Sequence, residues 1–322
     1  MRGIRSLGLL GLYVGAQLVA LVLAVPFKMA GLASTSNPNN PAAPIYIIVL
    51  IVLVPVAIIW LAAKRGGPAA LRALILLGIS ASLFVTLQAA LALVTPPPFY
   101  LGNPAAGNLG YWSVPLAGVI AVSLLLALTI EPQWYIVDLA GFVAAGSLIA
   151  LLGISFGILP TFILLIALLV YDAIAVYGTK HMLTLADVVT EMKVPILMVM
   201  PGSADFDYTT SGGLKAQQAK PREEREAMFM GLGDVVIPGT LVVSAFISLP
   251  ARMVAFGIGG NFIAAMGALL GSLIGYLFLI RLVNRGNAQA GLPFLNGGAF
   301  AGYAIAYLAV FHNPSLGISL AF

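Results

Sequence analysis

Two aspartates lie inside long apolar stretches of this chain, where an ionisable side chain is expensive to keep. Asp172 stands within the run ALLVYDAIAVYG, and Asp234 stands within MFMGLGDVVIPGT. An ionisable group at hydrocarbon depth normally faces a cavity, has a partner and marks a functional site. Because the two aspartates occupy consecutive apolar stretches, each is a candidate partner for the other.

The depth of each carboxylate can be predicted from its distance to the nearest membrane edge. Asp172 comes eight residues before Lys180, and Asp234 comes eight residues after Glu226. In helices, both separations correspond to about 12 Å. Since the two helices would run in opposite directions, both carboxylates are expected in one layer of the membrane, and they can meet if the helices pack together.

Two adjacent carboxylates can activate water. They cannot both be charged at low cost, so they share one proton and titrate as a unit. In aspartic proteases the ionised member takes a proton from water while the protonated member polarises the scissile carbonyl, and we expect no metal or other cofactor. The same pair would also suit an ion- or proton-coupled secondary transporter, or serve as interhelical hydrogen-bonding groups. Residue spacing alone leaves these alternatives open.

The elements that carry the aspartates belong to a membrane protein. The chain is 61% hydrophobic and 8% charged, with a mean hydropathy of +1.06, which is typical of an integral membrane protein. Its long, unbroken apolar stretches predict an all-α bundle. The absence of cysteine excludes disulfides and thiolate chemistry. Basic residues between the apolar stretches suit lipid headgroups, so no nucleic acid is expected as a partner.

Nine apolar stretches approach the roughly 20 residues that cross a bilayer. Their predicted bounds are 7–32, 43–63, 69–94, 113–130, 134–153, 158–178, 228–249, 254–283 and 291–312. Thirteen Lys and Arg residues fall on one side of this nine-helix arrangement, and only Lys28 and Arg252 fall on the other. The side rich in basic residues stays cytoplasmic. We therefore predict a cytoplasmic N-terminus, an outside C-terminus and, in a prokaryote, a location in the cell membrane.

The whole chain, 1–322, is predicted to be a single membrane domain. Residues 1–178 would supply six spans, 179–227 a cytoplasmic loop, and 228–322 three more spans. Within the loop, HMLTLADVVTEMK has the apolar spacing of a surface helix. The following VPILMVMP predicts a strand, and residues 202–227 have the composition of a mobile loop.

Three short motifs resemble those of the presenilin and signal peptide peptidase family of GxGD intramembrane aspartic proteases. They are a YD motif, a GxGD motif and a PAL-like motif, at Tyr171-Asp172, Gly231-Leu232-Gly233-Asp234 and Ala290-Gly291-Leu292-Pro293. The third departs from the family pattern, with Ala for Pro and Gly for Ala at its first two positions. Motif order and the nine-helix plan look closest to prokaryotic, archaeal-type presenilin homologues.

This resemblance implies an intramembrane aspartic endopeptidase that cuts transmembrane segments of other membrane proteins. Asp172 and Asp234 would be its catalytic residues. Eukaryotic members work with partner subunits, but nothing in this sequence indicates a partner-binding site, so the chain is expected to act alone. It is also expected to remain uncut in the loop between its sixth and seventh spans. Other protease classes are disfavoured, because the chain has no HExxH and no serine with a plausible histidine partner.

Residues near the aspartates have predicted supporting roles. Tyr171 would orient Asp172 or anchor its helix. Gly231 and Gly233 would permit a helix or a substrate to approach Asp234 closely, or would be ordinary packing glycines. The PAL-like segment predicts a loosened helix start whose backbone groups bind substrate, with a plain helix start as the alternative.

The predicted strand has a role of its own. Hydrolysis needs an extended peptide, and an unwound membrane substrate must still satisfy its backbone groups. Pairing with a strand of the enzyme would do so. The residues predicted to bind substrate in this way are Ile196, Leu197, Met198 and Val199, a short membrane-surface segment being the alternative. Among the other acids, which are assigned no chemistry, Asp138 lies deep enough to warrant a control substitution.

Overall fold

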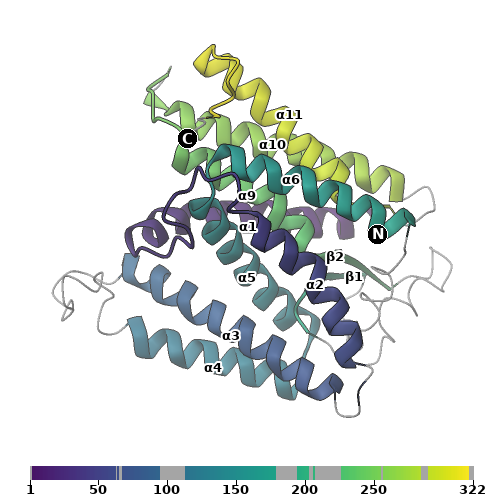
Figure 1. The fold of residues 1–322 in the computed structure, drawn as a ribbon. Coiled ribbons are helices and arrows are strands. Elements are labelled where there is room, and N and C mark those ends of the chain that lie inside the picture. Colours follow the sequence, from purple (N-terminus) through teal and green to yellow (C-terminus); the bar gives the residue numbers. More distant parts are fainter. Residues whose placement is uncertain are drawn as a thin grey trace.

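The computed structural model describes residues 2–62, 64, 67–94, 113–178, 194–202, 206, 226–254, 257–283 and 289–318. Within these ranges the chain forms nine α-helices and one two-stranded sheet (Figure 1). The helices are α1 (Arg2–Met29), α2 (Ile45–Ala62), α3 (Gly67–Val94), α4 (Ser113–Ile130), α5 (Trp134–Ser155), α6 (Ile158–Ala173), α9 (Leu232–Ser248), α10 (Gly260–Val283) and α11 (Leu292–Phe311). A π-helical turn, η3 (Ile174–Gly178), extends α6.

Seven segments in this described part of the chain are long and apolar enough to cross a membrane. They are the segments of α1, α3, α4, α5, α6 with η3, α10 and α11, and α9 is a shorter apolar helix. Helix α9 is the centre of the bundle, since it packs against α1, α5, α6, α10 and α11. In Figure 1, α3 and α4 lie side by side at one edge and α10 and α11 lie together at the other.

Close packing of α10 against α11 depends on glycines. Gly267, Gly271 and Gly275 follow one another at four-residue spacing on α10. A methyl group added at Gly271 would collide with the carbonyl oxygen of Gly298 and the backbone of Gly302. Such small-xxx-small surfaces let two membrane helices approach to backbone contact. The glycines thereby fix where α11, and the PAL-like segment at its start, can lie.

The sheet confirms the strand predicted in VPILMVMP and adds a second strand. Strand β1 (Leu197–Pro201) pairs antiparallel with β2 (Ala227–Gly231), with Leu197 opposite Gly231 and Pro201 opposite Ala227. The prediction of a helix from residue 228 was therefore wrong for its first four residues. Pairing with β1 uses the backbone groups of Met228 and Met230, and α9 begins only at Leu232, after an extended Gly231 with φ −66° and ψ 138°.

Other predicted helix bounds need small corrections. The first helix ends at Met29, not at residue 32, because Gly31 adopts φ 69° and the Leu32 N–H bonds back to the Phe27 carbonyl at 3.1 Å. The eighth begins at Gly260, not at residue 254, after a turn closed by the Met253–Gly259 bridge. The predicted surface helix at 181–193 and most of the 202–227 loop lie outside the described residues.

Candidate active site

Asp172 lies at the end of α6, where the helix changes to π-helical geometry. Its side chain is buried, with 6% of its surface exposed. The backbone N–H of Leu292, the first residue of α11, donates a 3.0 Å hydrogen bond to its Oδ2. Single π-helical turns occur frequently at functional sites. Asp172 is thus held between the end of one helix and the start of another.

Asp234 lies in the first turn of α9, directly after the β2 strand. Its carboxylate lies against Gly291, because a methyl group added at Gly291 would stand 3.0–3.1 Å from the carboxylate atoms. No larger residue fits beside Asp234 there without moving it.

The two carboxylates therefore contact two consecutive residues, Gly291 and Leu292. Asp172 bonds to the N–H of Leu292, and Asp234 contacts the preceding Gly291. The two acids also interact electrostatically. Three segments that are far apart in the sequence converge here: the end of α6, the start of α9 and the start of α11. Both carboxylates lie beside the start of α11, and residues 227–231, treated as helical in the depth prediction, form β2.

Sequence reasoning missed Tyr177, which holds the segment before α11. Its hydroxyl donates to Gln289 Oε1 at 2.8 Å and accepts from the Ala290 N–H at 3.2 Å. Tyr177 follows Asp172 by five residues, the spacing of a π-helical turn. Both residues thus hold neighbouring parts of residues 289–292. The sequence signal that could have identified Tyr177 is the second tyrosine in the run YDAIAVY.

The glycines of the GxGD motif face different surroundings from Gly291. A methyl group added at Gly233 would meet no atom within 4 Å of the described structure, and one at Gly231 would meet only the Asp234 carboxylate, at 3.5–3.9 Å. Close helix packing does not require either glycine. Leu232, between them, is buried, and its N–H donates to the Ile196 carbonyl at 3.0 Å. This bond ties the start of α9 to β1.

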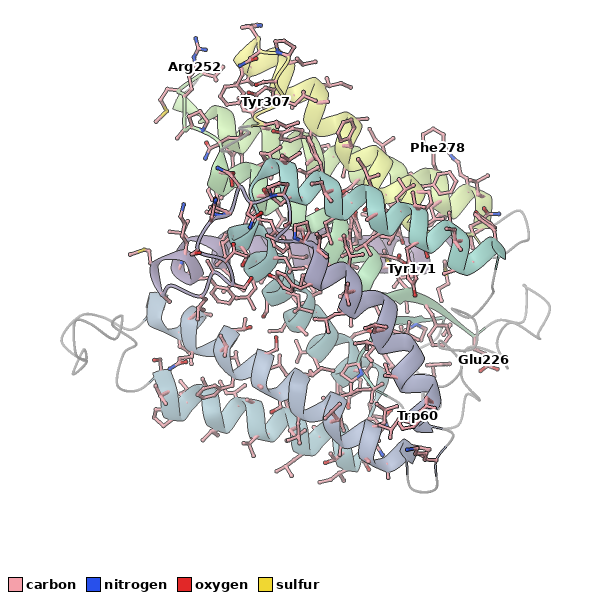
Figure 2. All side chains as sticks on the ribbon, viewed as in Figure 1. Trp60, Tyr171, Glu226, Arg252, Phe278 and Tyr307 are labelled. Atoms are coloured by element: carbon pink, nitrogen blue, oxygen red, sulfur yellow. The ribbon has the colours of Figure 1, made fainter. Side chains whose placement is uncertain are left out.

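The remaining predicted residues lie around this centre. Tyr171 precedes Asp172 on α6, is partly exposed and lies toward the end of the bundle that carries the sheet (Figure 2). Met198 and Val199 are fully buried within β1. The Val199 N–H donates a 2.6 Å hydrogen bond to Oδ1 of Asp138, on α5. Within the described residues, no group of three or more acidic or histidine side chains is arranged to hold a metal.

Comparisons with known proteins identify the family of the chain. The family model for signal-peptide peptidase, presenilin aspartyl protease, matches residues 10–311, so the chain belongs to this family. It is also similar to two structures of a presenilin family intramembrane aspartate protease. The structure in space group C222 has 27% identity and a TM-score of 0.64, covering 94% of this chain and 99% of that one. The structure in space group P2 has 28% identity and a TM-score of 0.62, covering 94% and 97%. A comparison with curated proteins found no match.

These findings define a multi-pass integral membrane protein that is an intramembrane aspartic protease, acting on transmembrane substrates within the bilayer. The resemblance carried by the YD and GxGD motifs is confirmed at the level of the family. The alternative of a secondary transporter finds no support.

Proposed function

We propose that Asp172 and Asp234 are the catalytic pair of this protease. The observation that carries the proposal is their convergence on Leu292 and Gly291, which brings two acids from separate helices to one place. No third acidic side chain is needed. The residues that directly precede the two aspartates support the pair. They are Tyr171, before Asp172, and Gly231, Leu232 and Gly233, before Asp234.

Different surroundings suggest different roles for the two acids. A hydrogen bond donated to a carboxylate stabilises its charged form, and Asp172 accepts one from Leu292. Asp172 then takes a proton from water while the water oxygen attacks the scissile carbonyl carbon, and Asp234 gives its proton to the carbonyl oxygen. In the second step the amide nitrogen receives the proton held by Asp172 and the hydroxyl proton returns to Asp234, so the C–N bond breaks to give an acid and an amine.

We assign the PAL-like segment, Ala290 to Pro293, mainly to holding the aspartates. Its Leu292 N–H is already occupied by Asp172, and its Gly291 leaves room for Asp234. Among the described residues, by contrast, no atom lies within 4 Å of a methyl group added at Gly233, and we assign that side of the site to the substrate. These contacts divide the site into a side that positions the acids and a side that a peptide can approach.

The alternation of hydrogen bonds in the sheet indicates which strand receives the substrate. Bonds from Gly202 to Glu226 and from Leu232 to Ile196 flank the β1–β2 ladder. Alternate pairs bond in an antiparallel ladder, so the backbone groups of 197, 199 and 201 point away from β2, and those of 227, 229 and 231 point away from β1. Asp138 occupies the outward N–H of Val199. The predicted substrate strand, Ile196 to Val199, then becomes the inner strand, and β2 offers the edge.

A substrate strand added to β2 would lie beside the catalytic pair. Strand β2 ends at Gly231 and α9 begins at the next residue. Asp234 is therefore three residues beyond the edge that would hold the unwound peptide. Strand addition satisfies the peptide backbone through the ladder, which removes the main cost of unwinding a helix in a membrane.

We further propose nine membrane crossings by one domain, residues 1–322, with a cytoplasmic N-terminus, an outside C-terminus and a location in the cell membrane. The seven long apolar segments, with α2 and α9, would supply the crossings. The contacts at the two ends of the bundle support this orientation. Near the N-terminus, a methyl group added at Gly8 would meet Met200 of β1, so α1 begins at the end that carries the sheet. Near the C-terminus, Val310 at the end of α11 lies against Gly260 at the start of α10. In Figure 2, Trp60 and Glu226 lie toward one end and Arg252 lies toward the other. We expect the uncut chain to act without partner subunits.

The catalytic assignment is tested with purified protein in liposomes and a single-span substrate, with products identified by mass spectrometry. Wild type should cut within the apolar segment, and Asp172→Asn and Asp234→Asn should each lower the rate by about 10³-fold or more. Glu131→Gln, a carboxylate-to-amide change at the exposed residue that follows α4, is the matched control and should cleave normally. Retained cleavage in either aspartate variant would refute the assignment.

Substrate addition at the β2 edge is tested by disulfide cross-linking. The natural chain has no cysteine, so only the introduced cysteines can form disulfides. In an Asp234→Asn background, a cysteine at Phe229 should form a disulfide with a cysteine near the substrate cleavage site. A cysteine at Leu197, on the inner strand, should not. The reverse pattern would assign the substrate to β1.

A further inference from the structure

Asp138 is a third acidic residue inside a membrane-spanning helix, and it is not part of the proposed catalytic pair. It lies on α5 with 5% of its surface exposed, and its Oδ1 accepts the 2.6 Å hydrogen bond from Val199, 61 residues later in the chain. Its other oxygen, Oδ2, is buried and has no hydrogen-bond partner among the described residues. Keeping an acid at such a place is costly, which points to a role beyond packing.

The partner of Asp138 is a backbone group of the outer edge of β1. Val199 pairs with Phe229, and this pair lies between the bonded pairs of the ladder. Its N–H therefore points away from β2 and would otherwise be free to bond to another strand. Since Val199 is fully buried, that N–H needs an acceptor. Asp138 supplies the acceptor from a helix, and the outer edge of β1 is closed at its middle residue.

The same face of α5 also contacts the start of α9, the helix that carries Asp234. Gly141, one turn after Asp138, is so close to the sheet that an added methyl group would lie 3.6 Å from the Pro195 carbonyl oxygen and 3.7 Å from Leu232 Cδ1. Neighbouring Val137 and Ala140 are fully buried. Helix α5 thus contacts Pro195, two residues before β1, Val199 in the middle of β1, and Leu232, the first residue of α9.

We infer that Asp138 is a positioning residue for proteolysis. By occupying the Val199 N–H it closes the outer edge of β1, directs the substrate strand to β2 and fixes the register in which the peptide meets Asp172 and Asp234. This inference rests on the proposed function, because it presumes cleavage by that pair and strand addition at β2. It adds a residue that touches neither the substrate nor the reacting atoms.

Three variants separate the hydrogen bond from the presence of a side chain. Asp138→Leu removes the acceptor, and Val199→Pro removes the donor at a position whose N–H the β1–β2 ladder does not use. Asp138→Asn keeps an acceptor oxygen without a charge. Ser147→Ala is the control, since Ser147 is buried on the same helix but bonds to Thr86 on α3, away from the sheet.

The main measurement is the distribution of cleavage positions, because it does not depend on how much of the enzyme is folded. We expect Asp138→Leu and Val199→Pro to spread cleavage over neighbouring peptide bonds and to raise KM by about tenfold, as loss of one hydrogen bond predicts. Asp138→Asn and Ser147→Ala should keep the wild-type positions and KM. Rescue by asparagine would show that the acceptor, not the charge, positions the strand.

Contrary outcomes are distinct. Wild-type cleavage positions in an active Asp138→Leu or Val199→Pro enzyme would overturn the inference, as would a spread distribution in Asp138→Asn. If the leucine variant does not fold, the proline variant decides. Cleavage that persists in Asp172→Asn or Asp234→Asn would instead refute the proposed function, and it is measured on the same substrate.

Discussion

The backbone N–H of Leu292 and the carboxylate of Asp172 are joined by a 3.0 Å hydrogen bond across 120 residues of sequence. This bond makes the start of α11 part of the surroundings of Asp172. It also accounts for the altered PAL-like motif, because a backbone donor does not depend on the side chains of the two positions that depart from the family pattern, Ala290 and Gly291. The site requires the backbone path of this segment and, at residue 291, a small side chain beside Asp234.

Removing this donor should impair catalysis. Leu292→Pro deletes the N–H at the first position of α11, where proline is tolerated by a helix. Charge-assisted hydrogen bonds contribute about 1.5–3 kcal/mol, so we expect kcat to fall by about ten- to a hundredfold. Leu292→Ala shortens the side chain but keeps the donor, and it should lose much less. Equal losses in both variants, measured as kcat on folded protein, would contradict the role of the bond.

Tyr177 should matter through its hydroxyl. Tyr177→Phe removes the bonds to Gln289 and Ala290, which hold the segment leading into α11. Each is expected to contribute about 0.5–1.5 kcal/mol, so we predict a lower Tm and a several-fold lower kcat. The matched control is Tyr135→Phe, at the exposed start of α5. A Tyr177→Phe enzyme with wild-type Tm and kcat would show that the segment is held by other contacts.

Size at residue 291 should control the position of Asp234. Gly291→Ala places a methyl group 3.0–3.1 Å from the Asp234 carboxylate, which a shift of a few tenths of an ångström can relieve, and it restores the alanine of the family motif. Gly291→Val adds two further carbons against the same group. We expect the alanine variant to cleave within a few-fold of wild type and the valine variant to lose most activity. Comparable rates in a steady-state assay would argue against contact between these residues.

Two glycine-to-alanine changes near α11 should act in opposite directions. At Gly271 the added methyl group meets backbone atoms of α11, which must move apart, and overpacking of this kind costs about 1–3 kcal/mol. At Gly297, an exposed position of α11, it meets no atom of the described residues within 4 Å, and the higher helix propensity of alanine contributes up to about 1 kcal/mol. Thermal unfolding in detergent should lower Tm for Gly271→Ala and keep or raise it for Gly297→Ala.

Local sequence was enough to predict several features of the site. Apolar stretches that contain a single acid mark Asp172 and Asp234 without knowledge of the fold, because burying a carboxyl in a membrane is costly. The run VPILMVMP predicted β1 correctly. The spacing of Gly267, Gly271 and Gly275 was also available in the sequence and indicates the α10–α11 contact.

Other features depend on pairs of residues that are far apart. Residues 228–230 are apolar enough for a helix and become a strand only because β1 lies beside them. In the sequence Asp138 is a single acid on an apolar helix, and only the fold places the Val199 N–H as its hydrogen-bond partner. In each case the deciding contact joins segments separated by a long stretch of chain, and such contacts leave no periodic pattern in either segment.

Composition and local motifs determined that this protein is a helical membrane protein, that two of its acids are candidates for chemistry, and which family it resembles. These conclusions follow from the cost of burying polar groups in hydrocarbon, which each segment meets by itself. Only the tertiary structure decided that Gly291 and Leu292 receive the two carboxylates, that β2 forms, and that Asp138 closes the edge of β1. Those outcomes require a backbone donor, a carboxylate or a strand edge to find its partner across the fold, and packing of the whole bundle sets which partners meet.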